Sequence, residues 1–492
     1  MNLNKNYLAV AIVAATLVGC GSDSDSNSNN DDTPVSETPT FLECNTAGDQ
    51  CVVTGTINED FTMTADVQYV LDGLVRVGRG NTSFTAASDV TAAQADGVTL
   101  TIEPGTDVRG SDDGVLIVTR GNKLMAEGTK DAPITFSSLT DENFDGLGEW
   151  GGVIIQGLAP QYGQGGTGAC FADGPDDTTV YDETAVCNVQ GEGGDGVGYY
   201  GGNIPADNSG VLKYVRIAEA GKVAGPNNEV NGLTLMGVGH GTTIDYVQVH
   251  NNLDDGIEWF GGTVNVTHVV LTGNDDDDID FDTGYKGNIQ FAIVRKNPDL
   301  TTPSGSNDPR GIEANSSDEE YVPETEGALA NITLVGAKVT AGQYGMRLRG
   351  ALTTRIYNTA VVNWESCVRV DDAATGTDAG TIDSNVTLVN VIGDCAPDGF
   401  YTKRAADSEV GVVGAVAIDL TDAAALTATT EYTVSSWEPV DNGSGFAFEN
   451  TNYVGAVAPG TAAADAWWAG WVIDGSMDGI ADQDAPETTF AE

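Results

Sequence analysis

Basic residues are scarce in this chain of 492 residues, where 21 Lys and Arg oppose 73 Asp and Glu and leave a formal net charge of −52. A surface of this sign repels the phosphates of nucleic acids and the headgroups of anionic membranes, so neither is expected as a partner. Divalent cations or a saline medium are the natural complement of such a surface.

Familiar catalytic and nucleotide-binding motifs are also missing. The chain has no P-loop, no G-x-S-x-G elbow, no H-E-x-x-H and no EF-hand loop. Residues 196–201 (GVGYYG) satisfy G-x-G-x-x-G, but they lie in a Gly-rich stretch without a following helix. We therefore expect no bound nucleotide and no organic cofactor.

The longest apolar run, from Tyr7 to Val18, is too short to span a bilayer and follows Lys5, which predicts a signal peptide over residues 1–19. It ends in LVGC, which resembles the lipobox of bacterial lipoproteins and implies that Cys20 becomes an acylated, palmitate-bearing N-terminus. Gly21 lacks the acidic character associated with inner-membrane retention. The expectation is an exported protein, lipid-anchored in the outer membrane and facing the surface or the periplasm; an ordinary signal peptide with an incidental cysteine is the alternative.

The region after Cys20 is rich in Ser, Asp and Asn, so residues 20–41 are predicted to be a disordered tether. The six remaining cysteines are expected to form disulfides, because an exported chain meets oxidants. Metal ligation is the alternative, but no C-x-x-C spacing is present. The cysteines fall into three sequence-local pairs: Cys44 with Cys51, Cys170 with Cys187, and Cys367 with Cys395.

Helical periodicity is nearly absent, and a repeat takes its place. Residues 243–262 align without gaps to residues 265–284 at an offset of 22, and the match covers a strand, a turn and a second strand. The second strand returns at residues 311–315, 345–349, 367–371 and 399–403. Coils of roughly 20 to 25 residues are typical of a solenoid.

Alternation within the repeated second strand predicts which side chains point inward. One inward column is Ile257, Ile279, Ile312, Met346, Val368 and Phe400, and the other is Trp259, Phe281, Ala314, Leu348, Val370 and Thr402.

The predicted fold is all-β, a right-handed parallel β-helix with long loop insertions and a C-terminal cap. We expect the β-helix over residues 42–435, interrupted by a disulfide-containing insertion at 161–208, and the cap over 436–492. The cap contains Trp437, Trp467, Trp468 and Trp471, which are expected to cover the last open coil.

Several stretches carry a family resemblance, among them TLTIEPGTDVRG, LIVTRGNKLMAEGT, WGGVIIQG, NGLTLMGVG, DDGIEWFGGTV and DDDDIDFDTGYKGN. Together they resemble bacterial β-helix surface lipoproteins with a pectate-lyase-like solenoid, and the likeness spans most of the chain. The resemblance implies the fold and a surface location, and it implies no particular activity.

Charged residues are predicted to line up on the outside of the repeated strand. One outward column is Glu258, Asp280, Glu313, Arg347, Arg369 and Tyr401, and its neighbour is Phe260, Asp282, Asn315, Arg349, Asp371 and Lys403. Asp278, Asp280 and Asp282, with Glu258 one coil away, offer the oxygen ligands that Ca²⁺ prefers. The alternative is a solvated, Asp-rich turn whose side chains bind backbone amides.

Three functions fit this surface. The first is a binding protein for a glycan, a cation-bridged ligand or an outer-membrane receptor, with candidate ligand contacts at Arg347, Arg349, Arg369, Asp371 and Tyr401. The second is a calcium-dependent polysaccharide lyase or a glycoside hydrolase, with candidate catalytic residues Glu258, Asp280, Glu313, Lys286 and Arg347. The third is a passive structural or adhesive protein whose charged columns neutralise each other.

Overall fold

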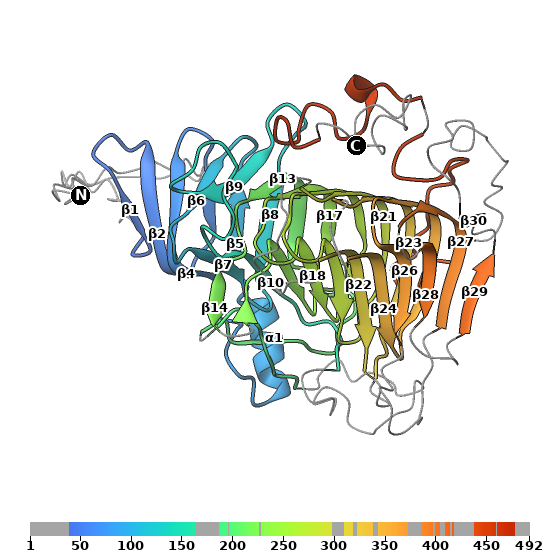
Figure 1. Cartoon of the computed structure of the whole chain (residues 1–492). Coiled ribbons are helices and arrows are strands. Elements are labelled where there is room, and N and C mark those ends of the chain that lie inside the picture. Colours follow the sequence, from blue (N-terminus) through green and yellow to red (C-terminus); the bar gives the residue numbers. More distant parts are fainter. Residues whose placement is uncertain are drawn as a thin grey trace, which may run out of the picture.

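The structure is a computed structural model of the whole chain. It describes residues 39–162, 186–194, 196–225, 228–297, 309–317, 322–337, 343–371, 385–396, 399–403, 409–413, 416–417, 437–458 and 460–477. The chain winds as a parallel β-helix whose strands stack coil on coil from the N-terminal end (Figure 1). The predicted parallel β-helix is confirmed.

The first coils contain the following elements: β1 (Leu42–Cys44), β2 (Gln50–Ile57), β3 (Phe61–Met63), β4 (Gln68–Val77), α1 (Ala87–Ala95), β5 (Thr99–Ile102), β6 (Asp107–Gly110), β7 (Val115–Val118), β8 (Lys123–Glu127), β9 (Ile134–Ser138) and β10 (Gly152–Gln156). β1 runs antiparallel to β2, and the Cys44–Cys51 disulfide joins the two strands. β2 pairs in parallel with β4 and so begins the coil stack.

The regular coils alternate a long strand with a short one. The long strands are β13 (Gly210–Ala218), β17 (Thr243–His250), β19 (Val266–Thr272), β21 (Lys286–Arg295), β23 (Glu326–Val335), β25 (Thr353–Val362) and β27 (Asn385–Asp394). The short ones are β16 (Leu233–Met236), β18 (Ile257–Phe260), β20 (Ile279–Asp282), β22 (Arg310–Ser316), β24 (Tyr344–Gly350), β26 (Ser366–Asp371) and β28 (Gly399–Lys403). β29 (Glu409–Val413) and β30 (Val416–Ala417) pair with β27.

The short strands build the interior as the alternation predicts. Ile257 pairs with Ile279, Ile279 with Ile312, Ile312 with Met346 and Met346 with Val368, and all five side chains are fully buried in one core cluster. The second inward column, from Trp259 to Val370, is equally buried. A large apolar side chain that is fully buried contributes roughly 1.5 to 3 kcal/mol to the free energy of folding.

The last short strand departs from the prediction by one residue. Val368 pairs with Tyr401 rather than Phe400, and Val370 pairs with Lys403 rather than Thr402. In the backbone register, the predicted alignment of Phe400 with Val368 and of Thr402 with Val370 is therefore wrong. Strand alternation alone does not report a slip of one residue.

Each long strand bends at one residue of positive φ, which the sequence analysis did not predict. These residues form a column: Tyr214, Tyr246, His268, Phe291, Asn331, Asn358 and Asn390. The bend divides the long strand into two straight segments, as seen where β13 pairs first with β8 and then with β9. With the short strands, the wall therefore has three faces.

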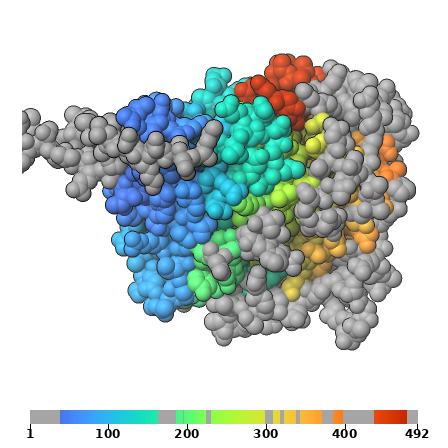
Figure 2. All heavy atoms as spheres, turned by 60° about the vertical axis from the view of Figure 1, so that its left-hand side comes forward, coloured from blue at the N-terminus to red at the C-terminus, as the bar shows by residue number. Residues whose placement is uncertain are grey.

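The segment 437–477 lies along the side of the solenoid, and we call it the strap. Trp471 packs edge-on against Tyr214 of β13 and Tyr246 of β17, and Trp467 packs against His268 of β19. In Figure 1 the strap (red) runs back above β21 and β17, and Figure 2 shows its red residues beside the blue-green first half of the chain. The expectation that Trp467 and Trp471 cover the last open coil is wrong, because their rings pack on aromatic side chains at the bends of earlier coils. Trp437, also expected there, stacks on Tyr357 of β25.

Side chains of the wall bind the strap backbone. Asn288 Oδ1 accepts from Val440 N at 2.7 Å, Gln290 Oε1 from Glu449 N at 2.8 Å, and Gln248 Oε1 from Ile473 N at 2.8 Å. A short 3-10 helix, η1 (Ala463–Asp465), interrupts the strap. The strap is therefore fixed at several coils.

Two smaller features complete the fold. The described part of the 161–208 insertion holds β11 (Val189–Gln190) and β12 (Tyr199–Tyr200), whose Val189 and Tyr200 pack on outward Ile154. β14 (Val223–Gly225) and β15 (Asn228–Glu229) form a hairpin. The predicted Cys367–Cys395 disulfide is confirmed, as is Cys44–Cys51, whereas Cys170 lies outside the described residues. No helix in the described ranges is long and apolar enough to cross a membrane.

Candidate functional site: an acidic cleft with an arginine edge

The charged outward column forms as the strand spacing predicts. Glu258 pairs with Asp280, Asp280 with Glu313, Glu313 with Arg347, and Arg347 with Arg369. Neighbouring strands are about 4.8 Å apart, so carboxylates on three successive coils meet guanidinium groups on the next two.

A cleft of about 290 Å³ opens over this column. Among the described residues, all those that line it are polar: Glu192, Asn231, Asp254, Asp255, Glu258, Asp276, Asp277, Asp280, Arg310, Glu313, Arg347 and Arg349. Such a lining suits a ligand that is itself hydrophilic, because an apolar molecule would leave these groups unsolvated.

Carboxylates gather at one end of the cleft. Oxygens of Asp255, Glu258 and Asp280 lie within 4.8 Å of one another, and Asp255 also joins a second trio with Asp254 and Asp276. Asn231 Nδ2 donates to Glu258 Oε2 at 2.5 Å, and Asp277 N donates to Asp255 Oδ1 at 2.9 Å. Asp280 Oδ1 is buried and has no hydrogen-bond partner in the described part of the chain.

Arginines gather at the other end, around buried Glu313. Arg310 Nη1 donates to Glu313 Oε2 at 2.7 Å, Arg349 Nε lies 2.6 Å from Oε1, and Arg347 Nη1 lies 3.7 Å from Oε1. Arg310 also binds Asp277 through its backbone N–H at 2.6 Å. Glu313 is thereby held as an ion-paired carboxylate.

The carboxylate end is electrostatically strained. Burial raises the pKa of Asp255, Glu258 and Asp280, and the neighbouring carboxylates raise the pKa of each further. The repulsion among these carboxylates is relieved either by protonation or by a bound cation. The donors are all oxygens, and one of them is unsatisfied, so this end fits a hard divalent cation such as Ca²⁺.

Three of the predicted site residues point elsewhere. Asp278 is fully buried beside Lys296, with Oδ2 and Nζ 2.8 Å apart. Asp282 accepts from Tyr162 Oη at 2.6 Å and from Asn315 Nδ2 at 3.1 Å. Lys286 pairs with Glu326 at 3.7 Å. Of the four predicted metal ligands, the structure brings together Glu258 and Asp280.

Of the predicted ligand contacts, some line the cleft and others do not. Arg347 and Arg349 line the cleft, whereas Arg369 donates to Tyr344 Oη at 2.7 Å and lies over its ring. The side chains of Asp371 and Tyr401 lie outside the described part of the chain. Their role stays a prediction.

Seven of the twelve residues that line the cleft were not predicted from the sequence as site residues. Asp254 and Asp255 precede β18, Asp276 and Asp277 precede β20, and Arg310 begins β22. The signal was present, because the repeat aligns the DDG turn at 254–256 with residues 276–278. It was missed because only strand residues were assigned to outward columns, whereas turns stack from coil to coil as well.

Comparison with known families agrees with this architecture. The model of the pectate-lyase-like β-helix domain matches residues 55–472, so the chain belongs to that family. Searches of curated proteins and of solved structures find no match. The family match shows the fold and does not identify a ligand.

Proposed function

We propose that this β-helix protein is a surface binding protein that holds an acidic glycan in the cleft with the help of a divalent cation, Ca²⁺ by preference. The observation that carries the proposal is the side-by-side arrangement of a carboxylate trio and an arginine edge in one polar cleft. A cation on the carboxylates and guanidinium groups at Arg347 and Arg349 would both attract a sugar carboxylate. Hydroxyl-rich ligands suit the remaining polar lining.

The enzymatic alternatives receive less support. A glycoside hydrolase needs two carboxyl groups free to act as acid and base, but Glu313 is held by three arginines. A lyase needs a side chain beside the metal that can accept the proton in its neutral form, and Lys286 is paired with Glu326 instead of lining the cleft. Arg347 remains the one predicted base in the cleft, so lyase activity is the second candidate.

The proposed location follows from the N-terminal signals. Acylation at Cys20 would anchor the chain in the outer membrane, and residues 21–38 would hold the solenoid, whose core begins at buried Phe41, away from the lipid. Membrane fractionation tests this, because Cys20→Ser should move the protein from the membrane fraction to the soluble fraction.

Titration of the full chain with polyuronate and neutral oligosaccharides, with Ca²⁺ or with a chelator, tests the binding function. We expect polyuronate binding that requires Ca²⁺ and that weakens by about tenfold or more in Asp280→Asn, since a charge-assisted contact is worth roughly 1.5 to 3 kcal/mol. Glu326→Gln, which removes a charge outside the cleft, is the control. Binding that ignores both Ca²⁺ and Asp280→Asn would refute the proposal, and growth of unsaturated-uronate absorbance would establish the lyase instead.

A further inference from the structure

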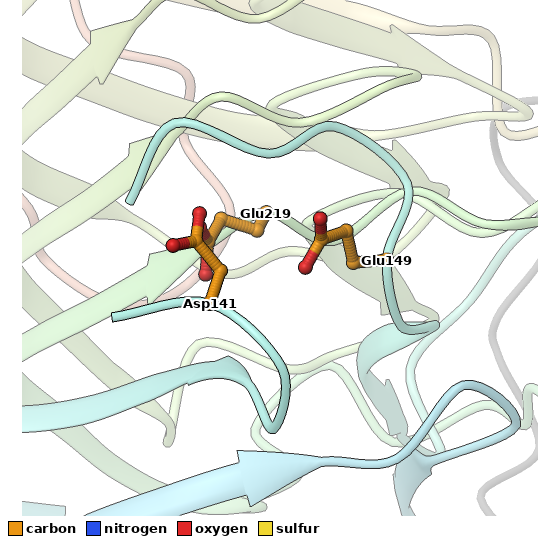
Figure 3. Close-up of side chains that lie close together, drawn as sticks. All are labelled: Asp141, Glu149 and Glu219. Atoms are coloured by element: carbon orange, nitrogen blue, oxygen red, sulfur yellow. The ribbon is translucent and has the colours of Figure 1, made fainter. Parts of the chain in front are cut away.

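A second group of carboxylates lies apart from the cleft, at the loop between β9 and β10. Asp141 and Glu149 come from this loop, and Glu219 follows directly after β13. Figure 3 shows the three side chains facing one another under the arch of the loop. One oxygen from each lies within 4.8 Å of the others.

The loop sequence carries most of a calcium-binding pattern. Residues 141–146 read DENFDG, which satisfies D-x-[DN]-x-[DN]-G, the first six positions of the EF-hand loop. Glu149 occupies the ninth position, from which such loops also supply a ligand. The twelfth position, where an EF-hand has its bidentate glutamate, is Gly152. The pattern is incomplete along the chain, and Glu219 supplies the missing carboxylate in space.

Glu219 also points to a ligand independently of the loop sequence. Its side chain is fully buried, and it accepts hydrogen bonds from the backbone N–H groups of Ser138 at 3.1 Å and Gly146 at 3.3 Å. It faces the carboxyl group of Asp141, and in the described ranges no lysine, arginine or histidine forms an ion pair with it. A buried carboxylate that meets another carboxylate without a cation is costly.

The loop is already fastened to two coils around this point. Glu149 N donates to Glu219 O at 2.9 Å, Gly148 N donates to Ala220 O at 3.1 Å, and Asn251 Nδ2 donates to Phe144 O at 2.7 Å. An ion among Asp141, Glu149 and Glu219 would therefore join the loop to the end of β13.

We propose that Asp141, Asn143, Asp145, Glu149 and Glu219 form a structural Ca²⁺ site that locks residues 139–149 onto the solenoid. All of the side chains offer oxygen, and none offers nitrogen or sulfur as a preferred ligand, which favours Ca²⁺ over zinc or copper. The site is separate from the cleft and does not depend on glycan binding.

Calorimetric titration of the full chain with Ca²⁺ alone tests the site. Wild type should show a class of Ca²⁺ binding that weakens by about tenfold or more in Glu219→Gln. Glu142→Gln, which removes a charge from the same loop at a position outside the pattern, should leave this class unchanged. Asp280→Asn should also leave it unchanged, which separates the loop from the cleft.

Limited proteolysis supplies a second readout. Ca²⁺ should protect residues 139–149 from cleavage in wild type and in Asp280→Asn, but not in Glu219→Gln. Should Glu219→Gln fail to fold, Asp145→Asn, at an exposed position of the loop, replaces it in both measurements. Unchanged Ca²⁺ affinity and unchanged protection in the folded loop variants would overturn the proposal.

Discussion

At the scale of single residues, buried Asp207 makes the stability of the fold depend on pH. Its side chain is buried, and Oδ2 accepts from Leu158 N at 3.0 Å and Ser209 Oγ at 3.4 Å. Burial raises its pKa from 3.8 to about 6, in spite of these hydrogen bonds. The folded state therefore binds this proton more tightly than the unfolded chain does.

The sign of the resulting pH dependence is fixed by the raised pKa. Protonated Asp207 stabilises the fold fully below pH 4, and this contribution is lost as pH rises through about 6. Two pKa units correspond to about 3 kcal/mol. We expect the free energy of unfolding of wild type, relative to Asp207→Asn, to fall by up to that amount between pH 4 and 7. Denaturant titrations at several pH values measure it, with exposed Asp131→Asn as the control, and a constant difference would contradict the assignment.

At the scale of elements, the strap is the part whose stability is most separable from the rest. Trp471 is 1% exposed and packs edge-on against Tyr214 and Tyr246 at ring distances of 5.7 and 6.0 Å. Replacing a buried tryptophan with alanine typically costs about 3 to 5 kcal/mol. Because the interior columns do not touch this residue, the loss should be local.

Hydrogen exchange tests the strap. In Trp471→Ala, amides of residues 466–477 should exchange faster, whereas amides of β18 and β20 should keep their protection. In Trp471→Phe, the exchange rates of these amides should lie between those of Trp471→Ala and those of wild type, since phenylalanine keeps an aromatic ring on the two tyrosines. Equal acceleration in β20 would mean that the strap is part of the global folding unit.

The elements also separate what periodicity predicts from what it does not. Ile257, Ile279 and Met346 were predictable because burial repeats with each coil and alternation permits one orientation. The bend at His268 was not, because positive φ at a histidine leaves no mark in hydrophobic patterning. The position of Trp471 depends on contacts with β13 and β17, more than two hundred residues earlier in the chain, which no local pattern reports.

Some residues of the candidate site were likewise predictable from the sequence, and others were not. Glu258 and Asp280 were predictable as outward partners on successive strands. Asp255 required the stacking of turns, and Glu219 required knowledge of which loop lies over the end of β13. Lys286 and Asp278 were assigned to the site by type and proximity in sequence, but each has a nearer opposite charge, Glu326 and Lys296.

At the scale of the whole molecule, the solenoid carries two separate groups of carboxylates, one in the cleft and one at the loop between β9 and β10. The strap and the cleft lie over different faces of the wall, since the strap covers the bends of the long strands and the cleft covers the short strands. A net charge of −52 gives both carboxylate groups a field that attracts cations. Ligands carrying negative charge should bind only where a cation or the arginine edge offsets that field.

The most direct test is a crystal of the full chain soaked with terbium, a substitute for Ca²⁺, and a uronate oligosaccharide. We predict an anomalous peak bounded by Asp255, Glu258 and Asp280, with a sugar carboxylate between that peak and Arg347. Terbium confined to residues 141–149 and Glu219, with no sugar in the cleft, would contradict the proposed function while leaving the loop site intact.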